Sequence, residues 1–119
     1  MIRVLVIDDS ASFLAAATEV VLAADGFELA GVAQSGAEGV ELARISRPDL
    51  ALIDLNMPGL DGNETAARLA RESPETMIVL MTVNPDSSNG AAEEAFDKRR
   101  LSPSALTEIW DHAQTSSAR

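Results

Sequence analysis

Short apolar runs rich in β-branched residues alternate with longer amphipathic segments along most of the chain. The runs at 4–7, 27–33, 50–53 and 77–81 have the length of strands, and a segment with helical spacing of apolar residues follows each of the first three. Parallel strands need a crossover between them, and the crossover is usually a helix. The alternation therefore predicts an α/β fold with helices on both faces of a parallel sheet.

The expected helices begin and end at residues suited to those positions. Ser10 can cap the first helix and Gly26 can end it. Ser35 and Glu38, three positions later, form a capping box for the second helix, which we expect to end near Pro48. These signals place the helices directly after the strands.

Charge and composition exclude several classes of function. The chain has 9 basic and 19 acidic residues, a formal net charge of −10, so its surface repels nucleic-acid phosphates and we expect no direct nucleic-acid binding. It has no cysteine, which removes disulfides and thiol catalysis. We see no cationic leader and no membrane-length apolar stretch. We therefore expect a cytoplasmic protein with one domain at 1–114 and a flexible tail at 115–119.

Polar side chains stand at the ends of three expected strands. Asp8 and Asp9 follow the first strand, Asp54 follows the third and Thr82 ends the fourth. Because sites in parallel sheets form beyond the carboxyl ends of strands, we expect these side chains to converge. Converging carboxylates favour a bound cation, and an all-oxygen set suits Mg²⁺. A carboxylate beside Mg²⁺ can attack a phosphoryl group, while Thr82 and Lys98, the only lysine, could contact its oxygens.

Four segments together resemble the receiver domain of response regulators. They are residues 6–10, 54–62, 80–82 and 96–98, and the order of residues in 54–62 carries most of the resemblance. The resemblance covers nearly the whole chain. It implies a doubly wound parallel five-stranded sheet, the CheY-like (β/α)5 form of the flavodoxin fold, of the type often joined to helix-turn-helix DNA-binding domains.

The resemblance also implies an acceptor and a metal site. Asp54 would accept a phosphoryl group from the phosphohistidine of a histidine kinase or phosphotransfer protein. Asp9, Asp54 and the backbone carbonyl of Asn56 would bind Mg²⁺, and Asp8 would act through a bound water. The chain would be a signalling switch rather than an enzyme, because its only chemistry would be Mg²⁺-dependent self-phosphorylation and self-dephosphorylation.

Two further residues would pass on the signal. By the resemblance, Thr82 and Lys98 would contact the phosphoryl oxygens, draw the loop after the fourth strand inward and reshape the face formed by the fourth helix, fifth strand and fifth helix. That face would meet an output partner that the sequence does not identify.

The segment before Lys98 departs from the family pattern. It is roughly six residues shorter than usual, so the fourth helix is expected to be shortened or missing. A strand at 95–97 would complete the sheet, whereas a helix at 91–100 would leave it one strand short. We favour the strand because 96–98 lies where the family places it. Lys98 could instead be a solvated lysine paired with Glu94.

Single positions also differ from the family. Ala95 stands where many receivers carry an aromatic residue that rotates on activation, Val83 follows Thr82 where a smaller residue is common, and Arg99 replaces a frequent proline. A shortened fourth helix could expose apolar sheet edge, which motivates the hypothesis of a homodimer. Ser102 and Pro103 predict the start of a terminal helix.

Two other functions compete with the switch. The altered segment before Lys98 favours a receiver-like module that binds a partner without phosphorylation. A phosphatase with an aspartyl-phosphate intermediate would need a second carboxylate two positions after Asp54, where the chain has Asn56.

Overall fold

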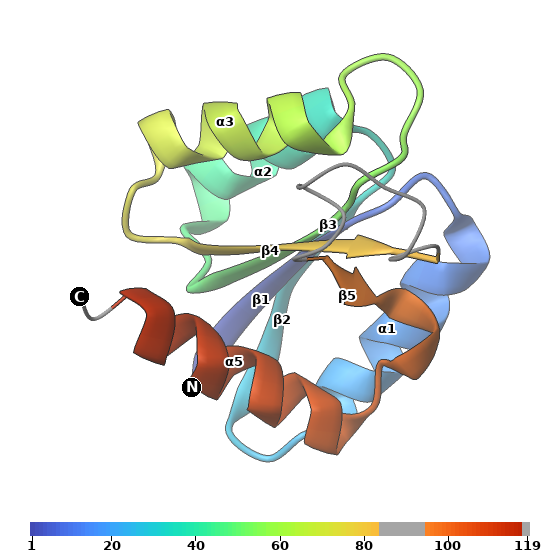
Figure 1. The fold of residues 1–119 in the computed structure, drawn as a ribbon, viewed down its shortest axis with the longest axis vertical. Helices are drawn as coiled ribbons and strands as arrows, with labels where there is room; N and C mark the ends of the chain where they lie inside the picture. The colour runs from blue at the N-terminus through green and yellow to red at the C-terminus, as the bar shows by residue number, and fades with distance from the viewer. Residues whose placement is uncertain (84–94, 118–119) are drawn as a thin grey trace.

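The computed structural model describes residues 1–83 and 95–117, with the side chains of these residues up to 115. It contains one parallel sheet of five strands in the order β2-β1-β3-β4-β5 (Figure 1). The strands are β1 (Ile2–Ile7), β2 (Phe27–Ala33), β3 (Leu50–Asp54), β4 (Met77–Thr82) and β5 (Phe96–Asp97). The helices are α1 (Ala11–Ala23), α2 (Gly36–Ser46), α3 (Gly62–Glu72) and α5 (Pro103–Ser117), with a 3₁₀ turn at Lys98–Arg100. The doubly wound CheY-like fold predicted from the sequence is confirmed.

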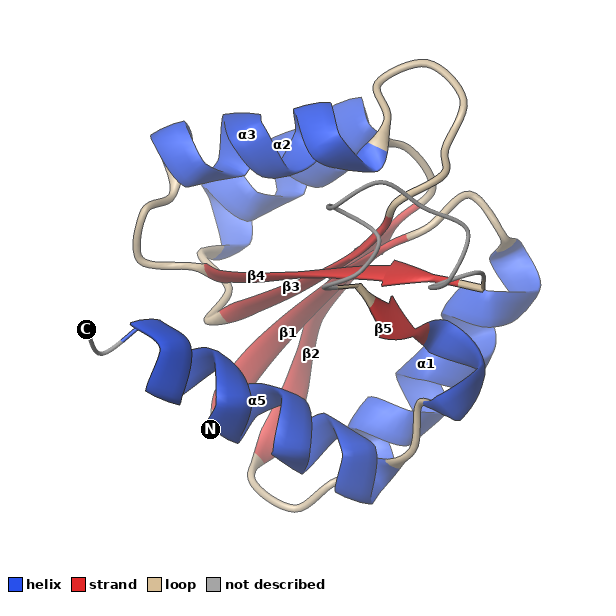
Figure 2. Cartoon of the chain, in the orientation of Figure 1, coloured by secondary structure: helices blue, strands red, loops and turns tan. Residues whose placement is uncertain are grey.

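The helices cover the two faces of the sheet in pairs, α1 with α5 and α2 with α3 (Figure 2). Alternate residues of β1 face opposite sides: Val4 and Val6 belong to the core under α1 and α5, and Leu5 and Ile7 to the core under α2 and α3. Burial on both faces explains why residues 4–7 of β1 and 50–53 of β3 are continuously apolar. The rigid centre of the sheet fixes the positions of the residues that follow its strands.

The expected helix caps are present. The Ser10 hydroxyl accepts from the Phe13 N–H at 3.2 Å, and the Ser35 hydroxyl accepts from the Glu38 N–H at 3.1 Å. Gly26 has a φ of 86°, a left-handed conformation that glycine adopts at little cost. α1 and α2 therefore begin shortly after the strands that precede them.

The fifth strand is present, so the strand interpretation is correct in the described part of 83–100. Phe96 and Asp97 pair with Met81 and Thr82 of β4. The alternative prediction of a helix over 91–100 is therefore wrong at its C-terminal end. There the backbone groups form hydrogen bonds with β4 instead of within a helix, so tertiary pairing overrides local helix propensity. The expected shortened or missing fourth helix lies at 84–94, outside the described residues.

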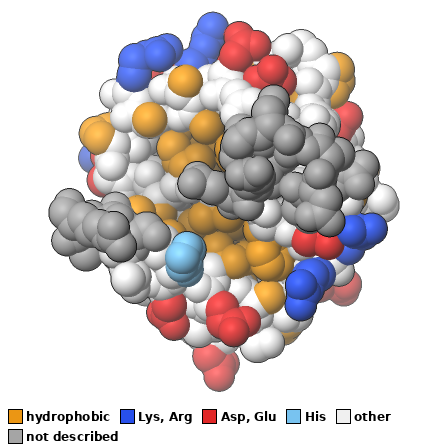
Figure 3. Space-filling model, viewed as in Figure 1, with side chains coloured by type: hydrophobic (Ala, Val, Ile, Leu, Met, Phe, Trp, Pro, Cys, Tyr) orange, Lys and Arg blue, Asp and Glu red, His pale blue; other side chains and the backbone are white. Residues whose placement is uncertain are grey.

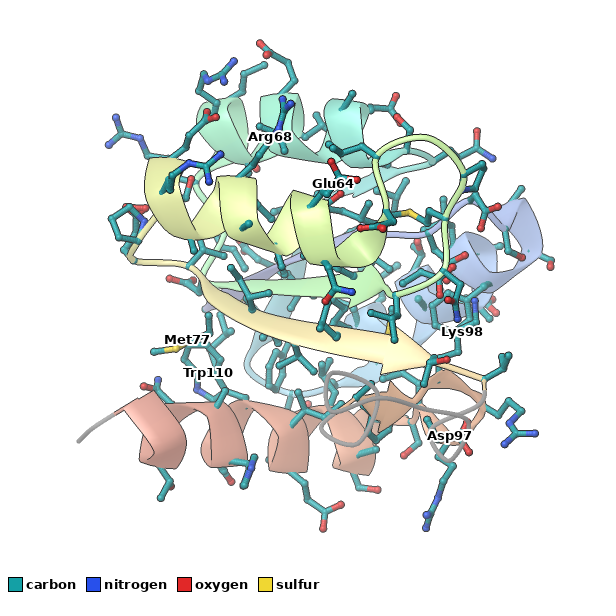
Figure 4. The ribbon with its side chains drawn as sticks, turned by 45° about the horizontal axis from the view of Figure 1, so that its top comes forward. Glu64, Arg68, Met77, Asp97, Lys98 and Trp110 are labelled. Carbon is teal, nitrogen blue, oxygen red and sulfur yellow. The ribbon has the colours of Figure 1, made fainter. Side chains whose placement is uncertain are left out.

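The terminal helix extends past residue 114, where we expected the domain to end, because α5 continues to Ser117. The Thr115 hydroxyl donates to the Asp111 carbonyl at 2.9 Å within this added turn. Near the other end of β4, Met77 and Trp110 pack against the same apolar cluster (Figure 4). None of the described helices is long and apolar enough to cross a membrane.

Candidate functional site

Three aspartates meet at the carboxyl ends of β1 and β3. Asp54 is the last residue of β3, and Asp8 follows Ile7, which is paired with Ile53. Parallel pairing therefore makes Asp8 and Asp54 neighbours. Together with Asp9 they offer one carboxylate oxygen each, all within 4.8 Å of one another. Asp8 and Asp54 are buried and Asp9 is exposed, so the cluster has one open side.

The surroundings of Asp54 favour its protonated form. Burial, followed by the negative charge of Asp8, raises the pKa of Asp54 from 3.8 to about 6. The charge of Lys98 and the Asn56 backbone N–H act in the opposite direction and lower this pKa. A bound cation near Asp54 would therefore stabilise the ionised carboxylate.

Lys98 supplies the positive side chain of the site (Figure 4). Its Nζ lies 2.7 Å from Asp8 Oδ2 and 3.8 Å from Asp54 Oδ2. The side chain is 13% exposed, so Lys98 is not a solvated surface lysine. Glu94, its partner in that alternative, lies outside the described residues. Pairing of Asp97 with Thr82 brings Lys98 to this edge, because it is the next residue after β5.

Thr82 and Asn56 are also neighbours of Asp54. Thr82 is buried at the end of β4, and the Asn56 side-chain amide donates to its hydroxyl at 3.4 Å. The Asn56 backbone N–H donates to Asp54 Oδ1, also at 3.4 Å. All six residues expected at the site, Asp8, Asp9, Asp54, Asn56, Thr82 and Lys98, are thus brought to one edge of the sheet.

Two supporting residues were not identified from the sequence. Ser10 donates its backbone N–H to Asp8 Oδ1 at 2.8 Å and so orients that carboxylate. Gly62 begins α3 beside β3, where a Cβ would lie 2.5 Å from the Asp54 carbonyl oxygen and 2.6 Å from Leu55 Cα. Gly62 at the end of the 54–62 motif was a signal for close backbone approach, but the sequence did not show which backbone it approaches.

The structure shows the contacts and burial of the three residues that depart from the family pattern, Val83, Ala95 and Arg99. The Asp97 carboxylate accepts from the Arg99 backbone N–H at 3.0 Å and from its guanidinium at 2.9 Å. Proline at this position would lack that N–H, so an ion-paired turn stands in its place. Ala95 is buried and Val83 is 43% exposed.

The sequence and its close relatives point to one family. Residues 4–99 match the family model of the response regulator receiver domain. The protein-glutamate methylesterase/protein-glutamine glutaminase 2 of Anaeromyxobacter dehalogenans is 45% identical over 89 residues, which are 75% of this chain and 26% of that protein. Response regulator GacA of Pseudomonas viridiflava is 36% identical over 105 residues, 88% of this chain and 46% of GacA. The chain spans less than half the length of these curated relatives.

Solved structures show the same fold. The response regulator domain of Thermotoga maritima CheB superposes with a TM-score of 0.80 at 24% identity, covering 96% of this chain and 97% of that domain. The signal receiver domain of a modulated diguanylate cyclase from Desulfovibrio desulfuricans G20 gives a TM-score of 0.73 at 28% identity, covering 93% and 91%. The similarity therefore extends over both faces of the sheet.

Proposed function

Because the chain belongs to the family of response regulator receiver domains, we propose that it is a phosphorylation-dependent switch with Asp54 as the phosphoryl acceptor. The observation that carries the proposal is the convergence of three carboxylates with Lys98 at one edge of the sheet. The phosphoryl donor would be a histidine kinase or a phosphotransfer protein, as expected for two-component signalling. No activity on other molecules is proposed for the chain.

The donor set fits Mg²⁺. Carboxylate oxygens are its preferred protein ligands, and the open side at exposed Asp9 leaves room for the waters that Mg²⁺ retains. We propose Asp9, Asp54 and the Asn56 backbone carbonyl as direct ligands, and Asp8 as a ligand through water. When bound, Mg²⁺ would neutralise charge on the phosphoryl oxygens during transfer.

The proposed step uses Asp54 as a nucleophile. A carboxylate oxygen attacks the phosphorus of phosphohistidine, the new acyl phosphate O–P bond forms, and the P–N bond breaks. Its electron pair returns to the imidazole nitrogen, which takes up a proton. Burial of Asp54 keeps bulk water from competing for the phosphorus, and Lys98, 3.8 Å from Asp54, offsets the added negative charge.

Thr82 and Lys98 would then signal the change. A phosphoryl oxygen can accept from the Thr82 hydroxyl and from the Lys98 ammonium. Both residues lie at the ends of the paired strands β4 and β5, so movement of either is transmitted to β5 and α5. Because Ala95 replaces a larger aromatic residue, this output would act without a rotating ring at that position.

Intact mass tests the proposal. The protein is incubated with Mg²⁺ and acetyl phosphate, beside the Asp54→Asn variant. We expect a gain of one phosphoryl group only in the unsubstituted protein, and loss of that gain when a chelator removes Mg²⁺. No gain under conditions where Mg²⁺ binding is demonstrated would contradict the proposal and favour a phosphorylation-independent binding module.

A further inference from the structure

The ring of Phe13 lies against the charged end of Lys98. Nζ of Lys98 is 4.8 Å from the ring centroid, over the face of the ring. The aromatic face carries partial negative charge and attracts a cation at this distance. Phe13 is therefore a neighbour of the site that its position in the sequence, in the first turn of α1, did not reveal.

The position of the ring is fixed independently of Lys98. The Ser10 hydroxyl accepts from the Phe13 backbone N–H as the cap of α1, and the half-buried ring packs against the apolar core formed by β1, β3, α1 and α5. A lysine side chain, by contrast, has a flexible stem of four carbons. The ring can therefore orient the lysine, whereas the lysine has little influence on the ring.

Lys98 and three neighbouring residues form a closed circuit of contacts. Asp8 Oδ1 accepts from the Ser10 N–H, the Ser10 hydroxyl accepts from the Phe13 N–H, and Lys98 Nζ contacts both the Phe13 ring and Asp8 Oδ2. The circuit holds the ammonium between an aromatic face and a buried carboxylate. Asp54 Oδ2 lies 3.8 Å away, outside hydrogen-bond distance.

We propose that Phe13 is a positioning residue that holds the Lys98 ammonium ready for a phosphoryl oxygen on Asp54. This inference rests on the proposed function. An aromatic face attracts the ammonium without acting as a strong hydrogen-bond acceptor, so donors on Nζ stay available to a phosphoryl group. The ring also shields the charge from water, which strengthens its attraction to nearby oxygens.

NMR tests the contact without any phosphorylation. Lys98 is the only lysine, so selective lysine labelling gives a single set of side-chain signals. Protons near the face of a ring resonate upfield. We expect upfield ε-CH₂ signals in the unsubstituted protein and in Phe13→Tyr, which keeps the ring, and a downfield return in Phe13→Leu, which keeps apolar volume but has no aromatic face.

Kinetics test the role. We expect Phe13→Leu to slow phosphorylation by acetyl phosphate and Mg²⁺ by roughly 2- to 30-fold, the range that corresponds to a cation–π contact, and Phe13→Tyr to restore the rate. In a Lys98→Met background, Phe13→Leu should have no further effect. If Lys98→Met is too unstable to assay, the Tyr variant and the chemical shifts decide.

The outcomes separate this inference from the proposed function. Unshifted lysine signals in the unsubstituted protein, or an equal loss of rate from Phe13→Leu with and without Lys98, would overturn the role of Phe13 even when Asp54 is phosphorylated normally. If no variant accepts a phosphoryl group, the proposed function fails, and the lysine signals alone then decide whether Phe13 positions Lys98.

Discussion

The folded protein favours the neutral, protonated form of the Asp54 carboxyl group. Burial and the charge of Asp8 raise its pKa to about 6 in the folded protein, from 3.8 as the ordinary value. Because the folded state holds this proton more tightly, the contribution of Asp54 to stability is fully present below pH 3.8 and is lost as pH rises through about 6. At neutral pH the ionised carboxylate therefore costs up to about 3 kcal/mol of folding free energy.

Replacing Asp54 by Asn removes this cost. We predict that Asp54→Asn, without metal, is more stable than the unsubstituted protein by about 1–3 kcal/mol at pH 7, and that the difference narrows as pH falls from 6 to 4. Urea unfolding in a chelator measures it. Asp9→Asn is the control and should have a smaller effect, because Asp9 is exposed. A difference that does not depend on pH would contradict the electrostatic explanation.

Lys98 is a second residue whose charge the fold depends on. Asp8 is fully buried and its Oδ2 lies 2.7 Å from Lys98 Nζ. Lys98→Met leaves that carboxylate without its cation, and we predict a loss of about 3–5 kcal/mol in the free energy of unfolding. Added Mg²⁺ should restore part of this loss, because it returns positive charge to the cluster.

The adjacent arginine gives a matched control for Lys98. Arg99 also pairs with an aspartate, but its side chain is 65% exposed and solvent screens the pair, so Arg99→Met should lower the free energy of unfolding far less than Lys98→Met does. Denaturant unfolding of both variants checks the contrast. If both variants lose the same free energy of unfolding, burial of the Lys98–Asp8 pair does not increase its contribution to stability.

The sequence predicts the charged residues of the site better than their contacts. Asp8 and Asp54 could be placed because they follow apolar runs, and Lys98 because 96–98 matches the family pattern. The hydrogen bond from Asn56 to Thr82 and the contact of Phe13 with Lys98 could not be predicted, since they depend on side-chain rotamers of residues far apart in the chain.

At the scale of elements, the start of α3 supports the acceptor strand. Gly62 allows the first turn of α3 to approach the end of β3 so closely that no Cβ fits between them. The Gly62 N–H donates to the Leu55 carbonyl at 3.2 Å and completes this junction. The helix therefore fixes the backbone that carries Asp54.

We predict that Gly62→Ala moves this junction and costs about 1–3 kcal/mol of stability, as expected for overpacking. It should also weaken Mg²⁺ binding, because Asp54 shifts with its backbone. Thermal unfolding and isothermal titration with Mg²⁺ measure the two effects. Gly31→Ala serves as the control, since its added Cβ would meet only side chains at 3.6 and 3.8 Å. Unchanged Mg²⁺ affinity in Gly62→Ala would contradict this role.

The parallel sheet and its first four strands were predictable from alternation, but β5 was not predictable from local sequence. Residues 91–100 contain strong helix formers, and Glu94 and Lys98 have the spacing of a helical ion pair. Pairing of Phe96 and Asp97 with β4 overrides that propensity. Only comparison with a family pattern distinguished the two outcomes.

At the scale of the whole molecule, the described residues cover the outer edge of β4 only in part. Among the described residues, β5 pairs only with Met81 and Thr82, and β4 is only partly buried from Met77 to Leu80. Apolar side chains gather between α3 and α5 on this side (Figure 3). Unpaired strand edges favour association with another chain.

We predict that the protein self-associates through this region, as the sequence hypothesis of a homodimer suggested. The net charge of −10 opposes association and salt screens it, so the average mass in analytical ultracentrifugation should rise with protein concentration and with salt. A monomer mass that is independent of concentration at both low and high salt would refute the homodimer.

The central claim, that Asp54 is the phosphoryl acceptor, is tested most directly by chemical trapping. Borohydride reduces an aspartyl phosphate to homoserine, so the protein is treated with acetyl phosphate and Mg²⁺, reduced, digested and sequenced by mass spectrometry. We predict homoserine at position 54 alone. Homoserine at position 8 or 9 instead, or at no aspartate, would contradict the assignment.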